Sequence, residues 1–200
     1  MEQDEYQSMK KAWEEMLQNE IPQPFPGRDI IRESWIRCRD YKINPERPKL
    51  DCLPADKLKK LRTQNYKELL TCARPFMESL HDIVTGSGFV VLLADQKGYL
   101  IETIGGKGTL KNATDISLSP GVNWTEEFMG TTSIGTCLFH GKPVQICGPE
   151  HYLRMCHTWT CSAAPIKNSK KEVIAVLNMS GDFQGTHPHT LGMVVAAAKA

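Results

Sequence analysis

The chain has 200 residues, of which 40% are hydrophobic, and its formal net charge is +1. This length and composition allow one domain with extensions, or two small domains. The near-zero charge removes the simplest argument for nucleic-acid binding, and the longest apolar runs, such as GFVVLLA, are far too short to span a membrane.

The first part of the chain predicts helices only. Residues 4–19 carry one apolar helical face, formed by Tyr6, Met9, Trp13, Met16 and Leu17. The proline-rich run IPQPFPG ends this helix, and a second helix is predicted over residues 28–41. A polar linker with three prolines follows. We therefore expect an N-terminal helical region over residues 1–54.

A long helix is predicted over residues 55–84, with a bend at Pro75. Its apolar positions step by three and four along Tyr66, Leu69, Ala73, Phe76, Leu80 and Ile83. This stripe suits packing on the chain's own sheet or a dimer seam, and the sequence favours neither. Together with the face of the first helix, it offers apolar surface for a symmetric partner.

After residue 86 the hydrophobic period becomes strand-like. GFVVLLADQKGYLIETIGG predicts a hairpin that turns at residues 95–98, and three more strands are predicted at 143–147, 160–167 and 172–180. Between them we expect a loop and helix over 124–139 and a two-turn helix over 150–157.

The pattern predicts an α+β fold for residues 55–200, with an antiparallel sheet of about five or six strands and flanking helices. The final helix begins near residue 187 and has no C-terminal stop signal. We therefore expect it to be truncated and the chain to be a fragment of a longer protein.

Seven cysteines occur in a chain whose acidic, polar N-terminus is not a signal peptide. A cytoplasmic location is therefore expected, where thiols stay reduced, so we expect no disulfides and at least one accessible thiol. The densest cluster is Cys147, His151, Cys156, His157 and Cys161. Metal binding or thiol redox sensing by this cluster remains an alternative, although no C-x2-C pair is present.

Buried free cysteine is common, and a structural role is favoured for Cys137 and Cys161. Cys161 also follows His157 by four residues, but no third orienting group is evident for nucleophilic catalysis. GGKGT lacks the spacing of a phosphate-binding loop. We therefore expect no catalytic residues, no bound metal and no cofactor.

Two segments carry the most specific signal: WTEEFMGTTSIGT at residues 124–136 and EHYLRMCHTWTCSAAPI at 150–166. In the first, the Gly and Thr spacing is typical of a tight loop that opens a helix. With ESWIRC at 33–38 and LNMSG at 177–181, these blocks resemble the N-terminal GAF sensor domain of sigma-54-dependent transcriptional regulators of the acetoin-regulator type.

That resemblance implies ligand sensing rather than catalysis. It implies a small-molecule effector, a homodimer, and downstream ATPase and DNA-binding domains that lie outside this fragment, which itself binds neither nucleic acid nor membrane. An enzyme on the same fold, such as a free-methionine-sulfoxide reductase, remains an alternative. The family usually has Asn where this chain has Thr132, so the ligand can differ from acetoin-like diols.

The expected effector pocket lies between the sheet and residues 124–136. The 150–157 helix would close it, and the small residues of CSAAPI would form its floor. An aromatic body near a carboxylate, as at Trp124 and Glu126, suits a polar or cationic ligand. The candidate ligand-binding residues are Trp124, Glu126, Thr131, Thr132, His151, His157, Trp159, Cys161 and Ala163.

Overall fold

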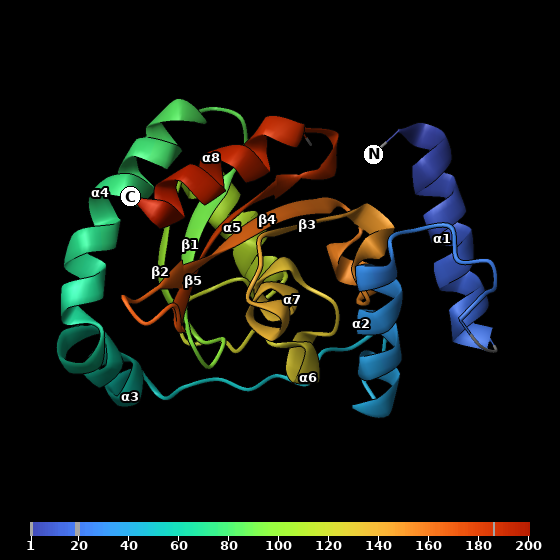
Figure 1. The fold of residues 1–200 in the computed structure, drawn as a ribbon, viewed down its shortest axis with the longest axis horizontal. Coiled ribbons are helices and arrows are strands. Elements are labelled where there is room, and N and C mark those ends of the chain that lie inside the picture. Colours follow the sequence, from blue (N-terminus) through green and yellow to red (C-terminus); the bar gives the residue numbers. More distant parts are fainter. Residues whose placement is uncertain (1, 19–20, 186) are drawn as a thin grey trace.

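A five-stranded antiparallel sheet forms the centre of the molecule (Figure 1). The computed structural model describes residues 2–18, 21–185 and 187–200. The strand order is β2-β1-β5-β4-β3. The strands are β1 (Val90–Asp95), β2 (Leu100–Gly105), β3 (Val144–Cys147), β4 (Trp159–Lys167) and β5 (Val173–Asp182).

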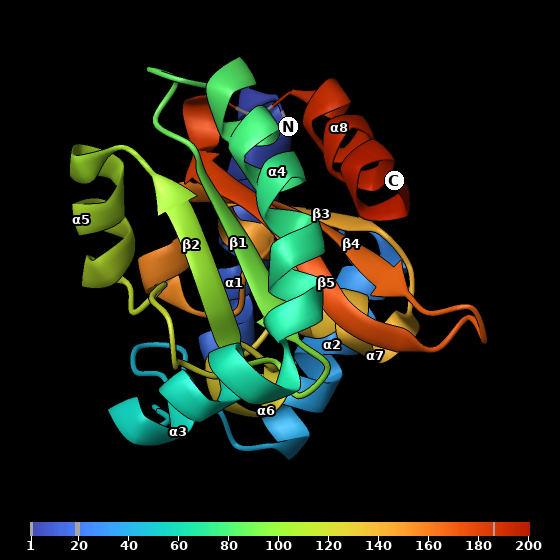
Figure 2. The same ribbon diagram turned by 90° about the vertical axis from the view of Figure 1, so that its left-hand side faces the viewer.

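Helices cover both faces of the sheet. They are α1 (Gln3–Gln18), α2 (Asp29–Asp40), α3 (Ala55–Lys60), α4 (Lys67–Ile83), α5 (Lys107–Asp115), α6 (Glu126–Met129), α7 (Ser133–His140) and α8 (Pro188–Lys199). Figure 2 shows α4 and α8 over one face, while α7 packs on β4 and β5 from the other. The predicted α+β fold with N-terminal helices is confirmed. None of the helices in the described ranges is both long and apolar enough to cross a bilayer.

The strands separate two hydrophobic cores. Val90, Leu92 and Ala94 of β1 face the core shared with α1, α2 and α7, whereas Val91 and Leu93 face the core under α4 and α8. Because successive strand residues point to opposite faces, a strand buried on both sides must be apolar throughout. This explains why GFVVLLA reads as one continuous apolar run.

The apolar face of α1 packs against its own chain. Met9, Trp13 and Met16 are buried in the first core, and Trp13 has no exposed surface. The expectation that this face is open to a symmetric partner is therefore wrong, because burial within the chain already stabilises it. Trp35 of α2 lies in the same core. A domain boundary at residue 54 stays a prediction.

The helix predicted over residues 55–84 is interrupted. A π-helical turn, Leu61–Asn65, separates α3 from α4, and α4 buries Leu70, Ala73, Met77 and Leu80. Phe76 and Ile83 of the predicted stripe are instead 39% and 67% exposed. The buried residues of α4 step by three and four from Leu70, so the buried face is offset from the predicted stripe and the stripe does not form one surface.

The single helix predicted over residues 150–157 is wrong. Two short 3-10 turns, Gly148–Glu150 and Arg154–Cys156, occupy this region, and His151 between them is extended. The side chain of Glu150 accepts hydrogen bonds from Arg28 and from the amide of Cys147. These contacts hold the segment in turns, because they fix its first residues against β3 and the α2 entry.

Candidate functional site

Glu126 connects three helices. Its buried carboxylate accepts hydrogen bonds from Ser34 Oγ at 2.6 Å, Thr136 Oγ1 at 2.8 Å and Arg37 Nε at 2.6 Å. Ser34 and Arg37 lie on α2, Glu126 begins α6, and Thr136 lies on α7. The carboxylate is thus fully paired, as a buried charge requires. Its role in this structure is to connect α2 to the α6–α7 loop.

The two threonines of the GTTSIGT motif also bond within the protein. Thr131 Oγ1 lies 2.7 Å from Ser34 Oγ. Thr132 caps α7: its hydroxyl accepts from the amide of Gly135 at 3.0 Å and donates to the carbonyl of Trp124 at 2.9 Å. A Cβ at Gly135 would lie 2.7 Å from a backbone nitrogen. The glycine is therefore required for this close approach.

Trp124 is buried, and its Nε1 donates to the carbonyl of Ser117 at 3.1 Å. The four candidate residues Trp124, Glu126, Thr131 and Thr132 therefore lie together, as the motif spacing indicates, and each has a partner within the chain. Their contact with a ligand stays a prediction.

The two histidines lie under α1 in the segment between β3 and β4. His151 is fully buried; its Nδ1 lies 3.0 Å from the carbonyl of Gly148, while its Nε2 has no partner in the described residues. Burial lowers the pKa of His151 to about 3 and that of His157 to about 4. His157 Nε2 lies 3.2 Å from the carbonyl of His151. Both imidazoles are neutral at neutral pH.

Cys161 and Ala163 of β4 face α7, whereas Ala164 faces the core under α4 and α8. Their cross-strand partners on β5 are Ser180, opposite Cys161, and Asn178, opposite Ala163. Trp159 begins the same strand and is buried. Of the small residues of CSAAPI, Cys161 and Ala163 therefore face the α7 side, and a ligand pocket above them stays a prediction.

A buried row of polar side chains crosses this floor. Ser180 Oγ donates to Asn178 Oδ1 at 2.7 Å, and Asn178 Nδ2 donates to Ser133 Oγ at 2.7 Å. Cys161 lies opposite Ser180 on β5, and burial raises the pKa of its thiol to about 12. We call these four residues, Ser133, Cys161, Asn178 and Ser180, the polar cluster.

Sequence reasoning did not include Ser133, Asn178 and Ser180 among the candidate site residues. The period of two in β5 could have found Asn178 and Ser180, because they alternate with the buried Leu177 and Met179. Ser133 follows the α7 cap, and only the packing of α7 on β5 brings it to the cluster.

The clustered cysteines are not reactive thiols in this structure. Cys147, Cys156 and Cys161 are buried, and burial raises the pKa of each thiol. Cys52 and Cys72 are exposed, so the expectation of at least one accessible thiol is confirmed. Within the described ranges, no three His, Cys, Asp or Glu side chains are placed to hold a metal ion.

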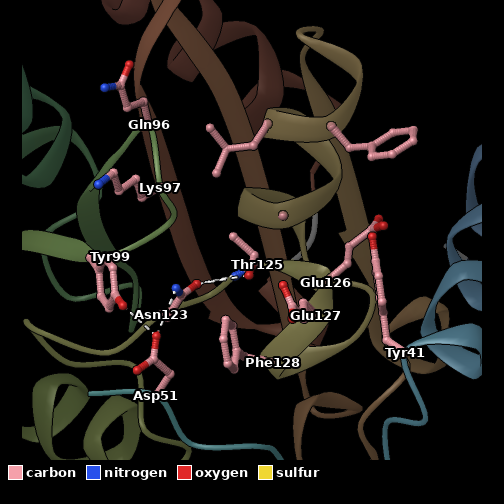
Figure 3. Close-up of a pocket in the computed structure, with 13 residues that line it drawn as sticks. Tyr41, Asp51, Gln96, Lys97, Tyr99, Asn123, Thr125, Glu126, Glu127 and Phe128 are labelled. Atoms are coloured by element: carbon pink, nitrogen blue, oxygen red, sulfur yellow. Dashed lines mark hydrogen bonds between the residues drawn. The ribbon is translucent and has the colours of Figure 1, made fainter. Parts of the chain in front are cut away.

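A surface pocket of about 500 Å³ opens beside the motif segment, whose Thr125, Glu126 and Gly135 line part of it (Figure 3). Tyr99 Oη donates to Asp51 Oδ2 at 2.5 Å, and Asn123 Nδ2 reaches the same oxygen at 3.3 Å. Glu127 and Phe128 of α6 form another part of its wall. The pocket is wide and open to solvent, so it encloses a small ligand less completely than an interior site would.

Several known proteins similar to this chain are bacterial transcriptional regulators. It is 34% identical over 175 residues to the signal-transduction and transcriptional-control protein of Clostridium beijerinckii, over 88% of this chain and 28% of that protein. It is 32% identical over 190 residues to AcoR, the acetoin dehydrogenase operon activator of Bacillus subtilis, over 95% of this chain and 31% of that protein. The chain thus spans about a third of the length of these two relatives.

A chain from the crystal structure of the E. coli DhaR(N)–DhaL complex has the same fold, with a TM-score of 0.81 at 17% identity over 86% of this chain and 58% of that one. The fold and the relatives together define the regulatory sensor domain of a transcriptional activator. More specifically, the family model described as MimR, N-terminal domain, matches residues 6–199, and the chain belongs to that family. The resemblance found from the motifs is thereby confirmed.

Proposed function

We propose that this chain is the GAF-like, effector-binding module of a cytoplasmic sigma-54-dependent activator. In this proposal a small molecule binds on the α7 side of β4 and β5 and controls a downstream ATPase domain. The observation that carries the proposal is the polar cluster: four polar side chains lie buried on β4, β5 and α7 among the apolar residues of the first core. Ligand sites typically combine apolar walls with a few such polar groups.

The charges near this region favour an uncharged effector. Glu126 is paired with Arg37, and Glu150 is paired with Arg28. A charged ligand would find no unpaired opposite charge here and would lose its hydration on entry. An uncharged molecule with hydroxyl or carbonyl groups would bond to the polar cluster without that penalty.

His151 supports a hydroxyl group in particular. With Nδ1–H donating to the Gly148 carbonyl, the neutral ring leaves Nε2 as an acceptor, and that atom is buried without a partner among the described residues. A buried acceptor without a partner costs about 1–3 kcal/mol. A ligand hydroxyl that reaches Nε2 would remove that cost. The metal or redox alternative is less favoured, because it requires thiolates that burial disfavours here.

The effector signal has a physical path to α2. Ser133 of the polar cluster follows Thr132, and Thr131 contacts Ser34 of α2. A shift of the start of α7 would therefore change the contacts of Thr131 and Glu126 with α2. This path is consistent with a sensor that transmits occupancy through its helices rather than with an enzyme, and it agrees with relatives that are regulators.

A homodimer is part of the proposal. Phe76 and Ile83 remain exposed on α4 and offer apolar surface to a second copy.

The test is calorimetric titration of the purified domain with a panel of small diols, hydroxyketones and alcohols. At least one is expected to bind, and Ala163→Leu is expected to abolish its binding. Ala164→Leu is the matched control, because both alanines are buried on β4 but face opposite cores. Each insertion costs about 1–3 kcal/mol of stability, so thermal melts must show that both variants fold. Equal affinity in the two variants would refute this placement.

A further inference from the structure

Basic side chains gather where α3 passes into α4. Between residues 55 and 74 there are six basic and two acidic residues, in a chain whose formal net charge is only +1. Figure 2 shows this region beside β2, and it lies on the opposite face of the sheet from α7. It is therefore separate from the proposed effector site. The field of these charges is positive and local.

Two arginines converge on one buried carboxylate. Arg62 Nη2 donates to Glu102 Oε2 at 2.8 Å, and Arg74 Nη2 donates to the same oxygen. Glu102 is 6% exposed, whereas the arginine side chains are 36% and 48% exposed. One carboxylate thus faces two guanidinium groups, which leaves one positive charge uncompensated. The repulsion between the two guanidiniums favours a second anion nearby.

Each guanidinium keeps free hydrogen-bond donors. An arginine has five N–H groups, and in the described part of the chain each of these two makes one hydrogen bond, to Glu102. Glu102 holds one N–H group of each planar guanidinium, so the remaining N–H donors of both arginines are already oriented before a ligand binds. Preorganised forks of this kind suit the oxygens of carboxylate and phosphate groups.

The two arginines line a surface pocket of about 590 Å³. Lys67 and Leu70 also line it, and Glu78 is the one acidic residue among the described residues of the lining. The π-helical turn at Leu61–Asn65 shapes this site, because it sets Arg62 apart from the register of α4. Like the pocket beside Tyr99, it is wide and open to solvent, so a bound anion would rest against the arginines rather than be enclosed.

We propose that this pocket is an anion site for a small phosphate-bearing molecule. Arg62 and Arg74 bind the phosphate oxygens through their free N–H groups, and Lys67 adds a third positive charge. Nucleic acid is a poorer match, because its backbone requires an extended basic stripe and the chain as a whole is near neutral. Bound anion would also relieve the repulsion between the arginines and stabilise the α3–α4 connection against β2.

Inorganic pyrophosphate is the probe, titrated by calorimetry at low salt. Arg74→Gln is expected to weaken binding by about tenfold or more, because it removes a charged fork. Lys111→Gln is the matched control: it removes one positive charge from the exposed face of α5 and should leave affinity nearly unchanged. Arg74→Lys keeps the charge but loses the fork, and an intermediate affinity is expected.

The Glu102→Gln variant tests whether Arg62 and Arg74 bind phosphate or serve only to stabilise the fold. The glutamine oxygen can still accept from the two arginines and keep them positioned, but the competing negative charge is gone. If the arginines bind phosphate, pyrophosphate binding is therefore expected to tighten. The proposal is overturned if wild-type protein shows no saturable binding up to about 10 mM. It is also overturned if Lys111→Gln weakens binding as much as Arg74→Gln, or if a folded Glu102→Gln variant binds more weakly. Thermal melts establish folding, and failure here would leave the effector proposal untouched.

Discussion

The indole of Trp13 and the imidazole of His157 meet edge to face, with ring centroids 4.7 Å apart and an interplanar angle of 81°. Trp13 Nε1 also donates to the carbonyl of Tyr152 at 2.8 Å, and the guanidinium of Arg154 lies over its ring at 4.5 Å. The N-terminal helix thus holds the segment between β3 and β4 in place. Any change in that segment must alter its contacts with α1.

Replacing Trp13 with Ala should lower the free energy of unfolding by about 3–5 kcal/mol, because it removes a fully buried aromatic side chain and its hydrogen bond. Leu17→Ala on the same helix is the control, since Leu17 is 41% exposed and should change stability little. Urea denaturation of both variants measures the difference. Similar losses in the two would show that α1 is not anchored through Trp13.

Removing one hydroxyl of the polar cluster should weaken effector binding. Ser180→Ala deletes a side chain on the α7 side of the sheet, whereas Ser162→Ala deletes an equally buried hydroxyl that bonds to Gln145. We expect a loss of about 1 kcal/mol or more in binding free energy for the first variant only. The measurement is calorimetry with an effector identified from the panel. A larger loss for Ser162→Ala would move the site to another surface.

The two buried histidines should make the fold acid-sensitive. Their folded pKa values, about 3 for His151 and about 4 for His157, lie below the ordinary value of 6.5. The unfolded chain therefore binds more protons as pH falls below about 6.5. The stability that comes from keeping these histidines neutral is fully present above about pH 6.5. As pH falls from there toward 4, the free energy of unfolding decreases by up to about 1.4 kcal/mol per pH unit for each histidine.

Urea denaturation at several pH values checks this slope. His157→Gln should flatten it between about pH 6.5 and 4, because one of the two titrating groups is gone. His189→Gln is the control, since His189 is exposed. An unchanged slope in His157→Gln would mean that His157 is not held neutral by burial.

Two thiols should react quickly with a thiol reagent in the native protein, namely Cys52 and Cys72, which are exposed. The other five are buried and should react only when the protein unfolds. A double Cys52→Ser, Cys72→Ser variant should leave no fast phase. Protection of further thiols by added zinc would instead support the metal-sensing alternative.

The exposed side chains of Phe76 and Ile83 on α4 should form the dimer interface. Sedimentation at about tens of micromolar is expected to give a dimer. A Phe76→Glu, Ile83→Glu variant is expected to give a monomer, because charges in an apolar interface are costly. Leu50→Glu, at a residue 60% exposed on another surface, should not dissociate the dimer. A monomeric wild-type chain would leave these side chains as ordinary surface residues.

The strands could be predicted from sequence because their signals are local. The hairpin that turns at residues 95–98 follows from two apolar runs and the glycine at its turn, and the structure has it as β1 and β2. The start of α7 could be predicted in the same way, because threonine at position 132 is a favourable helix N-cap residue.

The failures share a different cause, which is contact between distant parts of the chain. Glu150 is fixed by Arg28, 122 residues away, and this prevents the helix expected over residues 150–157. Trp13 donates a hydrogen bond to the carbonyl of Tyr152, 139 residues away. The apolar face of α1 is therefore buried within the chain rather than available as a dimer surface. A periodic pattern reveals that a face is apolar, but not what covers it.

The position of β5 in the sheet has a consequence for how the chain is made. It is the last strand in sequence, yet it lies between β1 and β4 and pairs with both. Until Asp182 has left the ribosome, the nascent chain can hold only two separate ladders, β1–β2 and β3–β4. Pairing Val90 with Ser180 then closes a loop of ninety residues, a non-local step of the kind that slows folding. The sensor domain is therefore completed from its C-terminal end, just before α8 is added.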